Sequence, residues 1–144
     1  MQQESTITLP YAEFGLIIRT DFSKESKWEI ICNEINDSGN MFETYALFIN
    51  DIKFQNLDEE KLPKFDSNNS LHTFILLVDE ICSSHADHPL KYIDLADNFG
   101  SYFRIIPSEV WGVTASLSVA NLDFSEYVRH LDNDGIFRGF PIVH

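Results

Sequence analysis

The chain has 144 residues, of which 44% are hydrophobic and twelve are phenylalanine, and this content supports one domain with a buried core rather than a disordered polypeptide. Its 23 acidic residues against ten Lys and Arg give a formal net charge of −13, which argues against binding to nucleic acid or anionic membranes, since both depend on basic side chains. The sequence shows no apolar run long enough to span a membrane and no signal-peptide pattern in its first ten residues, so we expect a cytoplasmic protein.

The first part of the chain contains a polar segment, a strand and a helix. We expect residues 1–13 to form a tail or an edge strand, and residues 14–144 to form a single globular domain. Phe14–Arg19 predicts the first strand, and its consecutive Leu and Ile residues indicate burial on both faces. Apolar spacing predicts a helix over Lys24–Asn36, with Ser23 as its N-terminal cap and a core-facing stripe of Trp28, Ile31, Cys32 and Ile35.

The middle of the chain contains two further apolar runs, Tyr45–Ile49 and His72–Val78, which predict the second and third strands. The later run is the most hydrophobic in the chain, so we place it at the centre of the sheet. Acidic residues after Asn56 predict a short capped helix over Leu57–Leu62, because acids in a first turn interact favourably with the helix dipole. The polar run Ser83–Pro89 predicts a solvated loop.

The next segment alternates between strand and turn signals. Lys91–Leu95 and Ser101–Ile106 predict an antiparallel pair of strands joined by a hairpin-length loop. Pro107–Glu109 predicts a helix start or a tight turn. Residues 114–122 are compatible with a helix and with an extended segment.

The chain ends with a helix and an aromatic tail. A capping box of Asp123 and Glu126 predicts a helix over Phe124–Leu131, and the tail over Ile136–Pro141 is expected to return to the body of the domain. These elements together predict an α/β (α+β) single domain. Its mixed sheet of about five strands is covered by the two main helices and the short acidic helix.

Four motifs run through the chain: Arg-Thr-Asp-Phe-Ser at 19–23 before Trp28, Pro-Ser-Glu-Val-Trp at 107–111, Leu-Ser-Val-Ala-Asn-Leu-Asp-Phe at 117–124, and Asp-Gly-Ile-Phe-Arg-Gly-Phe at 134–140. They resemble an uncharacterised family of small acidic domains of bacteria and fungi. The resemblance covers nearly the whole chain and implies a single-domain protein, often encoded among defence or secretion genes, with no established activity to carry over. The length and acidity are also similar to those of immunity proteins that neutralise polymorphic toxins.

Three carboxylates, Asp21, Asp51 and Asp79, each follow a predicted strand. Acids gathered at strand ends can hold a hard cation or receive a phosphoryl group. The same positions are also ordinary caps and turn formers, and no Lys or Thr stands where phosphoryl transfer requires a partner. The sequence therefore keeps a metal-dependent enzyme or binder as an alternative function.

Two loops are similar to metal-binding motifs but lack essential ligands. Ser83–His88 resembles a zinc-binding loop of metallo-hydrolases, but Ser83 occupies the place of its first histidine. His130–Pro141 resembles a calcium loop, with His130 and Pro141 where that loop needs its first ligand and its glutamate. We interpret the first as a solvated loop and the second as the end of a helix.

The cysteines and four of the aromatic residues each allow a functional and a structural interpretation. Cys32 beside His72 or His85 would form a thiolate pair, but its position next to the core stripe favours a buried thiol. Cys32 and Cys82 could in principle form a disulfide, but we expect two free thiols. Four aromatic residues could line a pocket or an interface, but such residues more often pack in the core. They are Trp28, Trp111, Phe137 and Phe140.

The sequence favours binding over catalysis, and we expect no enzyme activity and no cofactor. The leading hypothesis is an immunity-type protein that occludes the basic active site of a cognate protein toxin, with acidic side chains steering the encounter. Residues chosen for charge and expected exposure are Asp58, Glu59, Glu60, Asp79, Glu80, Asp87, Asp97 and Phe99. A structural or regulatory subunit is a third class, and solubility alone is the simpler explanation of the charge.

Overall fold

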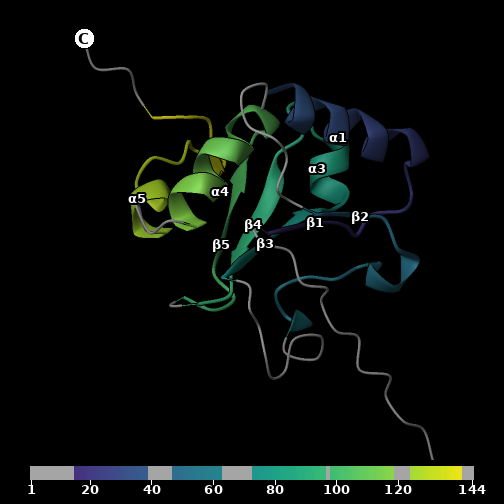
Figure 1. Ribbon diagram of the computed structural model, residues 1–144, viewed down its shortest axis with the longest axis horizontal. Helices are drawn as coiled ribbons and strands as arrows, with labels where there is room; N and C mark the ends of the chain where they lie inside the picture. The colour runs from purple at the N-terminus through teal and green to yellow at the C-terminus, as the bar shows by residue number, and fades with distance from the viewer. Residues whose placement is uncertain (1–14, 39–46, 63–72, 97, 119–123, 141–144) are drawn as a thin grey trace, which may run out of the picture.

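The computed structural model describes residues 15–38, 47–62, 73–96, 98–118 and 124–140, so the predicted tail over 1–13 lies outside the described residues (Figure 1). The strands are β1 (Leu16–Arg19), β2 (Leu47–Ile49), β3 (Phe74–Val78), β4 (Leu90–Asp94), β5 (Tyr102–Ile105) and β6 (Ile136–Phe137). The helices are α1 (Glu25–Ser38), α3 (Glu80–Ser84), α4 (Val110–Ser118) and α5 (Phe124–Val128), with 3₁₀ helices η1 (Ile52–Phe54) and η2 (Pro107–Glu109). The predicted α+β class is confirmed.

The strands form one mixed sheet in the order β2-β1-β3-β4-β5-β6. β1 pairs in parallel with β2 and β3, β4 is antiparallel to β3 and β5, and β6 is parallel to β5. Every residue of β1 and β3 is buried, and β3 lies inside the sheet, which confirms both predictions for these strands. The antiparallel pairing predicted for the 91–95 and 101–106 segments is also confirmed.

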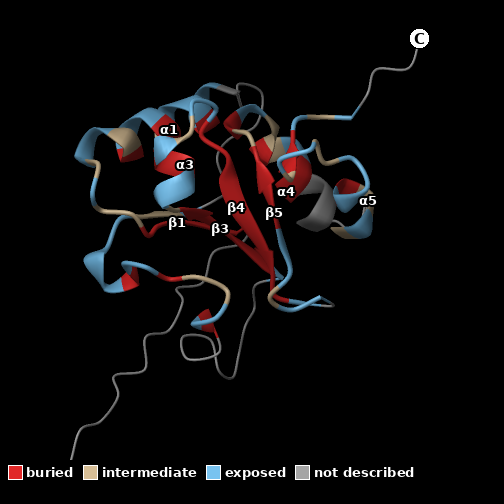
Figure 2. Ribbon diagram, turned by 180° about the vertical axis from the view of Figure 1, so that it is seen from behind, coloured by how far each residue is buried: buried red, intermediate tan, exposed pale blue. Residues whose placement is uncertain are grey.

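Alternate strand residues divide the core into two layers, because successive side chains of a strand point to opposite faces. Ile17, Leu76 and Phe103 pack with the helices α1, α4 and α5 on one face. Leu16, Ile75 and Leu77 pack on the other face against the segment 54–62. Figure 2 shows the buried strands between these two coverings.

Helix α1 forms where the sequence predicts it, one residue later at its start and two residues later at its end. The predicted apolar stripe of the helix faces the core, with Trp28, Ile31 and Ile35 buried. The predicted cap is not observed, because the Ser23 hydroxyl hydrogen-bonds to Asp21 Oδ1 at 2.6 Å instead of to the first turn of the helix. Trp111 Nε1 donates to the Ile35 carbonyl at 2.7 Å and joins α4 to α1.

The acidic helix predicted over 57–62 is wrong. The helical turn comes earlier, as η1, and the Asp51 side chain caps it by accepting from the Lys53 backbone nitrogen. Asn56 is not a cap, since it adopts a left-handed φ of 64° in a turn. Asp58 instead accepts from the backbone nitrogens of the two residues at 60 and 61, so the acidic residues lie in a turn over the sheet.

The loop predicted after β3 begins as a helix, α3. Asp79 caps this helix by accepting from the Cys82 backbone nitrogen at 3.1 Å, and His85 ends it. Helix α3 is not evident from the sequence, because its five residues are too few for an amphipathic period to be visible. Cys82 and Ser83 are its buried residues, and they anchor it on the sheet.

The C-terminal segment returns to the sheet, as predicted, and adds the sixth strand. The predicted helix over 124–131 ends at Val128, because Leu131 leaves the helix to form a β-bridge with Phe137. The Asp132 side chain accepts from the backbone nitrogens of Asp134 and Ile136, so it shapes this turn. In the ambiguous 114–122 segment, α4 continues to Ser118; residues 119–122 and Asp123 lie outside the described residues.

In the part of the chain that the structure describes, no helix has both the length and the apolar character required to cross a bilayer.

Replacement of Phe137 by alanine is expected to lower the free energy of unfolding by about 3–5 kcal/mol, because a large buried ring leaves a cavity. Phe137 is 1% exposed, and its ring centroid lies 5.0 Å from that of Tyr127. The matched control is Phe140→Ala, three residues later and 41% exposed, which should cost much less. Urea denaturation of both variants measures the difference, and equal losses would show that β6 is not part of the core.

Candidate functional site

The strand order places a topological switch between β1 and β3, because the chain leaves β1 toward β2 on one side and β3 pairs on the other. Ligands of open α/β sheets bind outside the carboxyl ends of strands at such a point. Here the two strand ends are joined by hydrogen bonds from the backbone nitrogens of Thr20 and Asp21 to the Val78 carbonyl, at 3.0 and 3.2 Å. These bonds continue the pairing of β1 and β3 to the carboxyl ends of both strands.

A buried arginine organises the ends of β1 and β2. Arg19 donates from Nε to the Asp21 carbonyl at 3.0 Å, from one terminal nitrogen to Asn50 Oδ1 at 3.2 Å, and from the other to Glu25 Oε2 at 3.3 Å. Its guanidinium also lies 4.4 Å from the centroid of the Phe22 ring. These contacts fix the loop between β1 and α1 to the end of β2.

Each of the three strand-end carboxylates has partners within the fold. Asp51 caps η1 and lies 3.9 Å from Lys53 Nζ. Burial would raise the pKa of Asp21, but hydrogen bonds from Ser23 and Ser83 and the charge of Lys24 lower it overall. Across the described ranges, no group of three or more His, Cys, Asp and Glu side chains is arranged to hold a metal ion.

Asp79 forms a two-point ion pair with Arg104. Arg104 donates to the two carboxylate oxygens at 3.0 and 2.7 Å, and also to the Pro89 carbonyl at 3.1 Å. The same Asp79 Oδ1 caps α3. The carboxylate is therefore engaged within the fold on both oxygens.

Lys91 lies directly opposite Arg104 on the neighbouring strand, and it is also buried. Like charges in such a pair repel, so each requires its own anion. Glu59 supplies the anion for Lys91, and Tyr102 lies under its ammonium group at 4.1 Å from the ring centroid. Two predicted partner contacts, Asp79 and Glu59, thus have structural roles.

The thiols lack the properties of a nucleophile. Burial, followed by the charge of Glu29, raises the pKa of Cys32 to about 12, and burial raises the pKa of Cys82 well above its usual value. Both cysteines are free, as predicted. His72 lies outside the described residues, and His85 Nδ1 accepts from the Asp87 backbone nitrogen at 3.0 Å.

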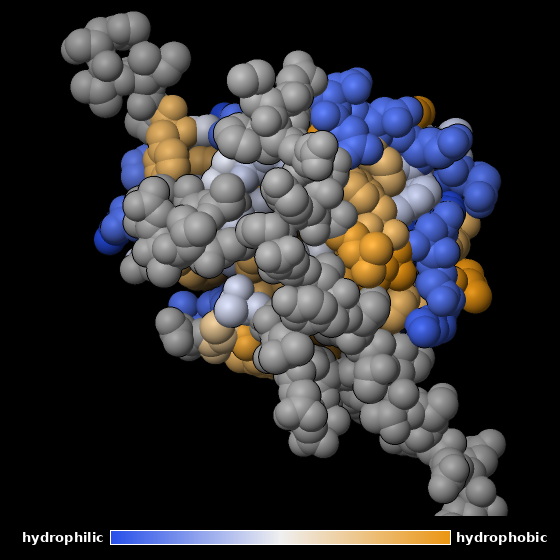
Figure 3. Space-filling view, viewed as in Figure 1, coloured by the Kyte–Doolittle hydropathy of each residue, from blue (hydrophilic) through white to orange (hydrophobic). Residues whose placement is uncertain are grey.

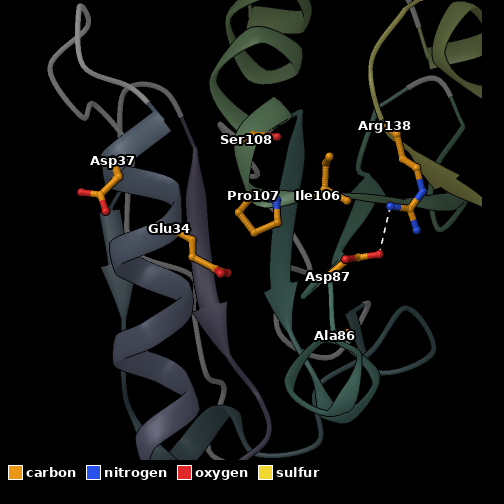
Figure 4. A pocket seen from close by; sticks show the side chains of 8 residues that line it. All are labelled: Glu34, Asp37, Ala86, Asp87, Ile106, Pro107, Ser108 and Arg138. Carbon is orange, nitrogen blue, oxygen red and sulfur yellow. Dashed lines mark hydrogen bonds and ion pairs between the residues drawn. The ribbon is translucent and has the colours of Figure 1, made fainter.

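An open pocket of about 520 Å³ lies between the C-terminal half of α1, the loop after α3, the start of η2 and the residue after β6 (Figure 4). This volume is within the range of about 300–1,000 Å³ that is usual for ligand pockets. Its lining residues are Glu34, Asp37, Ala86, Asp87, Ile106, Pro107, Ser108 and Arg138. Among the predicted contacts, Asp87 therefore belongs to this pocket.

A buried histidine supports one wall of the pocket. His88 Nδ1 lies 2.7 Å from Glu34 Oε1, and its Nε2 lies 3.4 Å from Lys27 Nζ. Because an ammonium group can only donate, this geometry assigns the ring proton to Nδ1. His88 adopts a left-handed φ of 49°, a strained conformation that concentrates at functional sites.

The other predicted contacts lie in separate places. Asp58, Glu59 and Glu60 cover the face of the sheet opposite the helices. Glu80 is exposed on α3, next to α1. Phe99 is exposed in the turn between β4 and β5, at the opposite end of the sheet from the carboxyl ends of β1 and β3, and Asp97 lies outside the described residues.

The sequence does not reveal that Glu34, Asp37, His88 and Arg138 come together at one pocket. Glu34 and Asp37 are visible as outward positions of the helix, but no local pattern links them to His88, which is 54 residues away from Glu34. Arg138 stands in the segment Asp-Gly-Ile-Phe-Arg at 134–138, where no local pattern points to a pocket. Its partner Asp87 comes from a segment 51 residues earlier.

Replacement of Asp79 by alanine is expected to lower the free energy of unfolding by about 3 kcal/mol, because it leaves Arg104 buried without its anion and removes the cap of α3. The matched control is Glu80→Ala, the next residue, which is exposed and should cost less than about 1 kcal/mol. Urea denaturation measures both. A loss at Asp79 no larger than the loss at Glu80 would contradict a structural role.

Comparison with known proteins gives a family but no activity. A family model described as a domain of unknown function (DUF6924) matches residues 15–140, which include the sheet, the helices and the pocket. No curated protein matches the chain. The match extends over most of the 144 residues, and the chain belongs to this family of domains of unknown function.

Proposed function

We propose that this protein binds a partner protein with a basic surface and neutralises it, as an immunity protein neutralises its toxin. The observation that carries the proposal is the distribution of charge. Most basic side chains among the described residues are held by carboxylates within the fold: Arg19, Lys53, Lys91, Arg104, Arg129 and Arg138. Among the described residues, the acidic side chains in excess of these pairs lie mostly at the surface.

The proposed interface is the outer surface of α1 and α3. Glu29, Asp37 and Glu80 are exposed there, and within the described part of the chain their side chains have no ion pair. Ile30 is 42% exposed and Ile81 is 52% exposed on the same two helices. Figure 3 shows the hydrophilic surface of α1 next to an apolar area over α3.

This combination supports binding to a basic protein. Exposed carboxylates steer a cationic partner at long range, whereas desolvated apolar side chains supply most of the affinity at contact. Asp58 and Glu59 are less suitable, because Asp58 holds backbone nitrogens and Glu59 neutralises Lys91. Among the sequence-predicted contacts, Glu80 and Asp87 lie on or beside the proposed interface.

The direct test is co-expression with the products of neighbouring genes. We expect one of these products to be toxic when it is expressed alone and to be tolerated when this protein is present. The two proteins should also co-purify. If no neighbouring product is toxic alone and rescued in the pair, the immunity function is excluded.

Charge reversal at Glu29 is expected to slow association with that partner at low salt by roughly threefold to tenfold. The difference should shrink at high salt, since ions screen exposed charges. Glu60→Lys is the matched control, because it makes the same charge change at an exposed acid on the opposite face of the sheet. Stopped-flow or biosensor association rates measure both, and equal slowing would place the interface elsewhere.

A further inference from the structure

The pocket beside α1 contains more carboxylates than it can neutralise. Glu34, Asp37 and Asp87 line it, and Arg138 is the basic residue among the described lining residues. The Arg138 guanidinium is already held by Asp87 Oδ2 at 3.0 Å and by Asp132 Oδ2 at 2.7 Å. Glu34 and Asp37 therefore receive no cation from the pocket itself.

Glu34 is fixed in position on the wall of this pocket. Its Oε1 accepts from His88 Nδ1, and His88 is buried and braced on its other side by Lys27. Within the described residues, Glu34 Oε2 has no partner. Figure 4 shows the Glu34 side chain extending from α1 toward the Asp87–Arg138 pair, with Asp37 one turn further along the helix.

The remaining wall of the pocket can pack against the aliphatic part of a long side chain. Ala86, Ile106 and Pro107 present apolar surface, and Pro107 is buried and so held in place. Ser108 adds a hydroxyl that has no partner in the described structure. Acceptors thus lie on opposite sides of the pocket, on Glu34 and on Asp87, with an apolar surface between them.

We propose that this pocket binds an arginine side chain of the partner protein. A guanidinium presents five donors in a plane and can reach acceptors on several sides, whereas an ammonium group is compact and strongly hydrated. The methylene groups of the arginine pack on Ile106 and Pro107. Its guanidinium donates to Glu34 Oε2 and to Asp87 Oδ1. This inference rests on the proposed function, because it names the side chain by which the basic partner is recognised.

The test uses the full chain labelled with ¹⁵N and three small probes, N-acetyl-arginine amide, N-acetyl-lysine amide and N-acetyl-citrulline amide. We expect the arginine probe to shift backbone resonances of residues 34–37, 86–88 and 106–108. Citrulline has the same shape without the charge and should bind at least about tenfold more weakly, as should lysine. An equal response to lysine would overturn the choice of arginine, and an equal response to citrulline would overturn the proposal.

Two variants locate the interaction. Glu34→Gln removes the charge but keeps an oxygen that can accept from His88, and Asp37→Asn leaves the His88 contact untouched. Each is expected to weaken binding of the arginine probe severalfold, with Glu34→Gln having the larger effect, about tenfold. Glu29→Gln, on the same helix but not in the pocket lining, should leave it unchanged.

Unchanged affinity in Glu34→Gln, with the spectrum of a folded protein, would overturn the proposal. The titration does not use the partner, so its result is separate from the co-expression test. Rescue of a toxic neighbour without probe binding would move the recognition to the exposed surface of α1 and α3. Probe binding without any rescue would leave an arginine-binding pocket in a protein that is not an immunity protein.

Discussion

The pairing of Lys91 with Arg104 across β4 and β5 is the constraint on which much of the structure depends. Two buried cations side by side are unstable unless each has an anion, and the fold provides Glu59 from one covering layer and Asp79 from the start of α3. The same ion pairs therefore hold the 52–62 segment on one face of the sheet and orient α3 at its edge. α3 in turn leads into His88, which fixes Glu34 on the wall of the pocket.

The parts of the fold that could be predicted are those set by local pattern. Leu16–Ile18 and Phe74–Val78 are continuous apolar runs, and both became strands that are buried on both faces, where apolar side chains can point either way without contact with water. The parts that could not be predicted depend on distant contacts. β6 has two residues and exists because Arg104 and Ile105 offer an edge for Ile136 and Phe137, which no window of the sequence can reveal.

The residues of the candidate site were even harder to predict, because they too depend on distant contacts. Acidic residues were selected for their charge and expected exposure, and this criterion cannot separate a carboxylate that holds the fold from one that is available. Asp79, Asp58 and Glu59 hold backbone or basic groups, whereas Glu34 and Asp37 lie in a pocket formed by four separate segments. The distinction requires knowledge of where the few basic side chains are placed, and that is a property of the tertiary structure.

Acidity alone would make a protein soluble without giving it affinity for any partner. Exposed hydrophobic residues are common on protein surfaces, so they do not by themselves identify a binding site. Affinity requires a place where charge is desolvated and fixed, because exposed ion pairs in water contribute little. Glu34 is fixed, since its carboxylate is held by a buried histidine beside an apolar wall, and its side chain is 44% exposed, so a bound partner would supply the desolvation. In the proposed interface, the pocket would therefore supply specificity, and the rest of the acidic surface would supply only a general attraction for a basic partner.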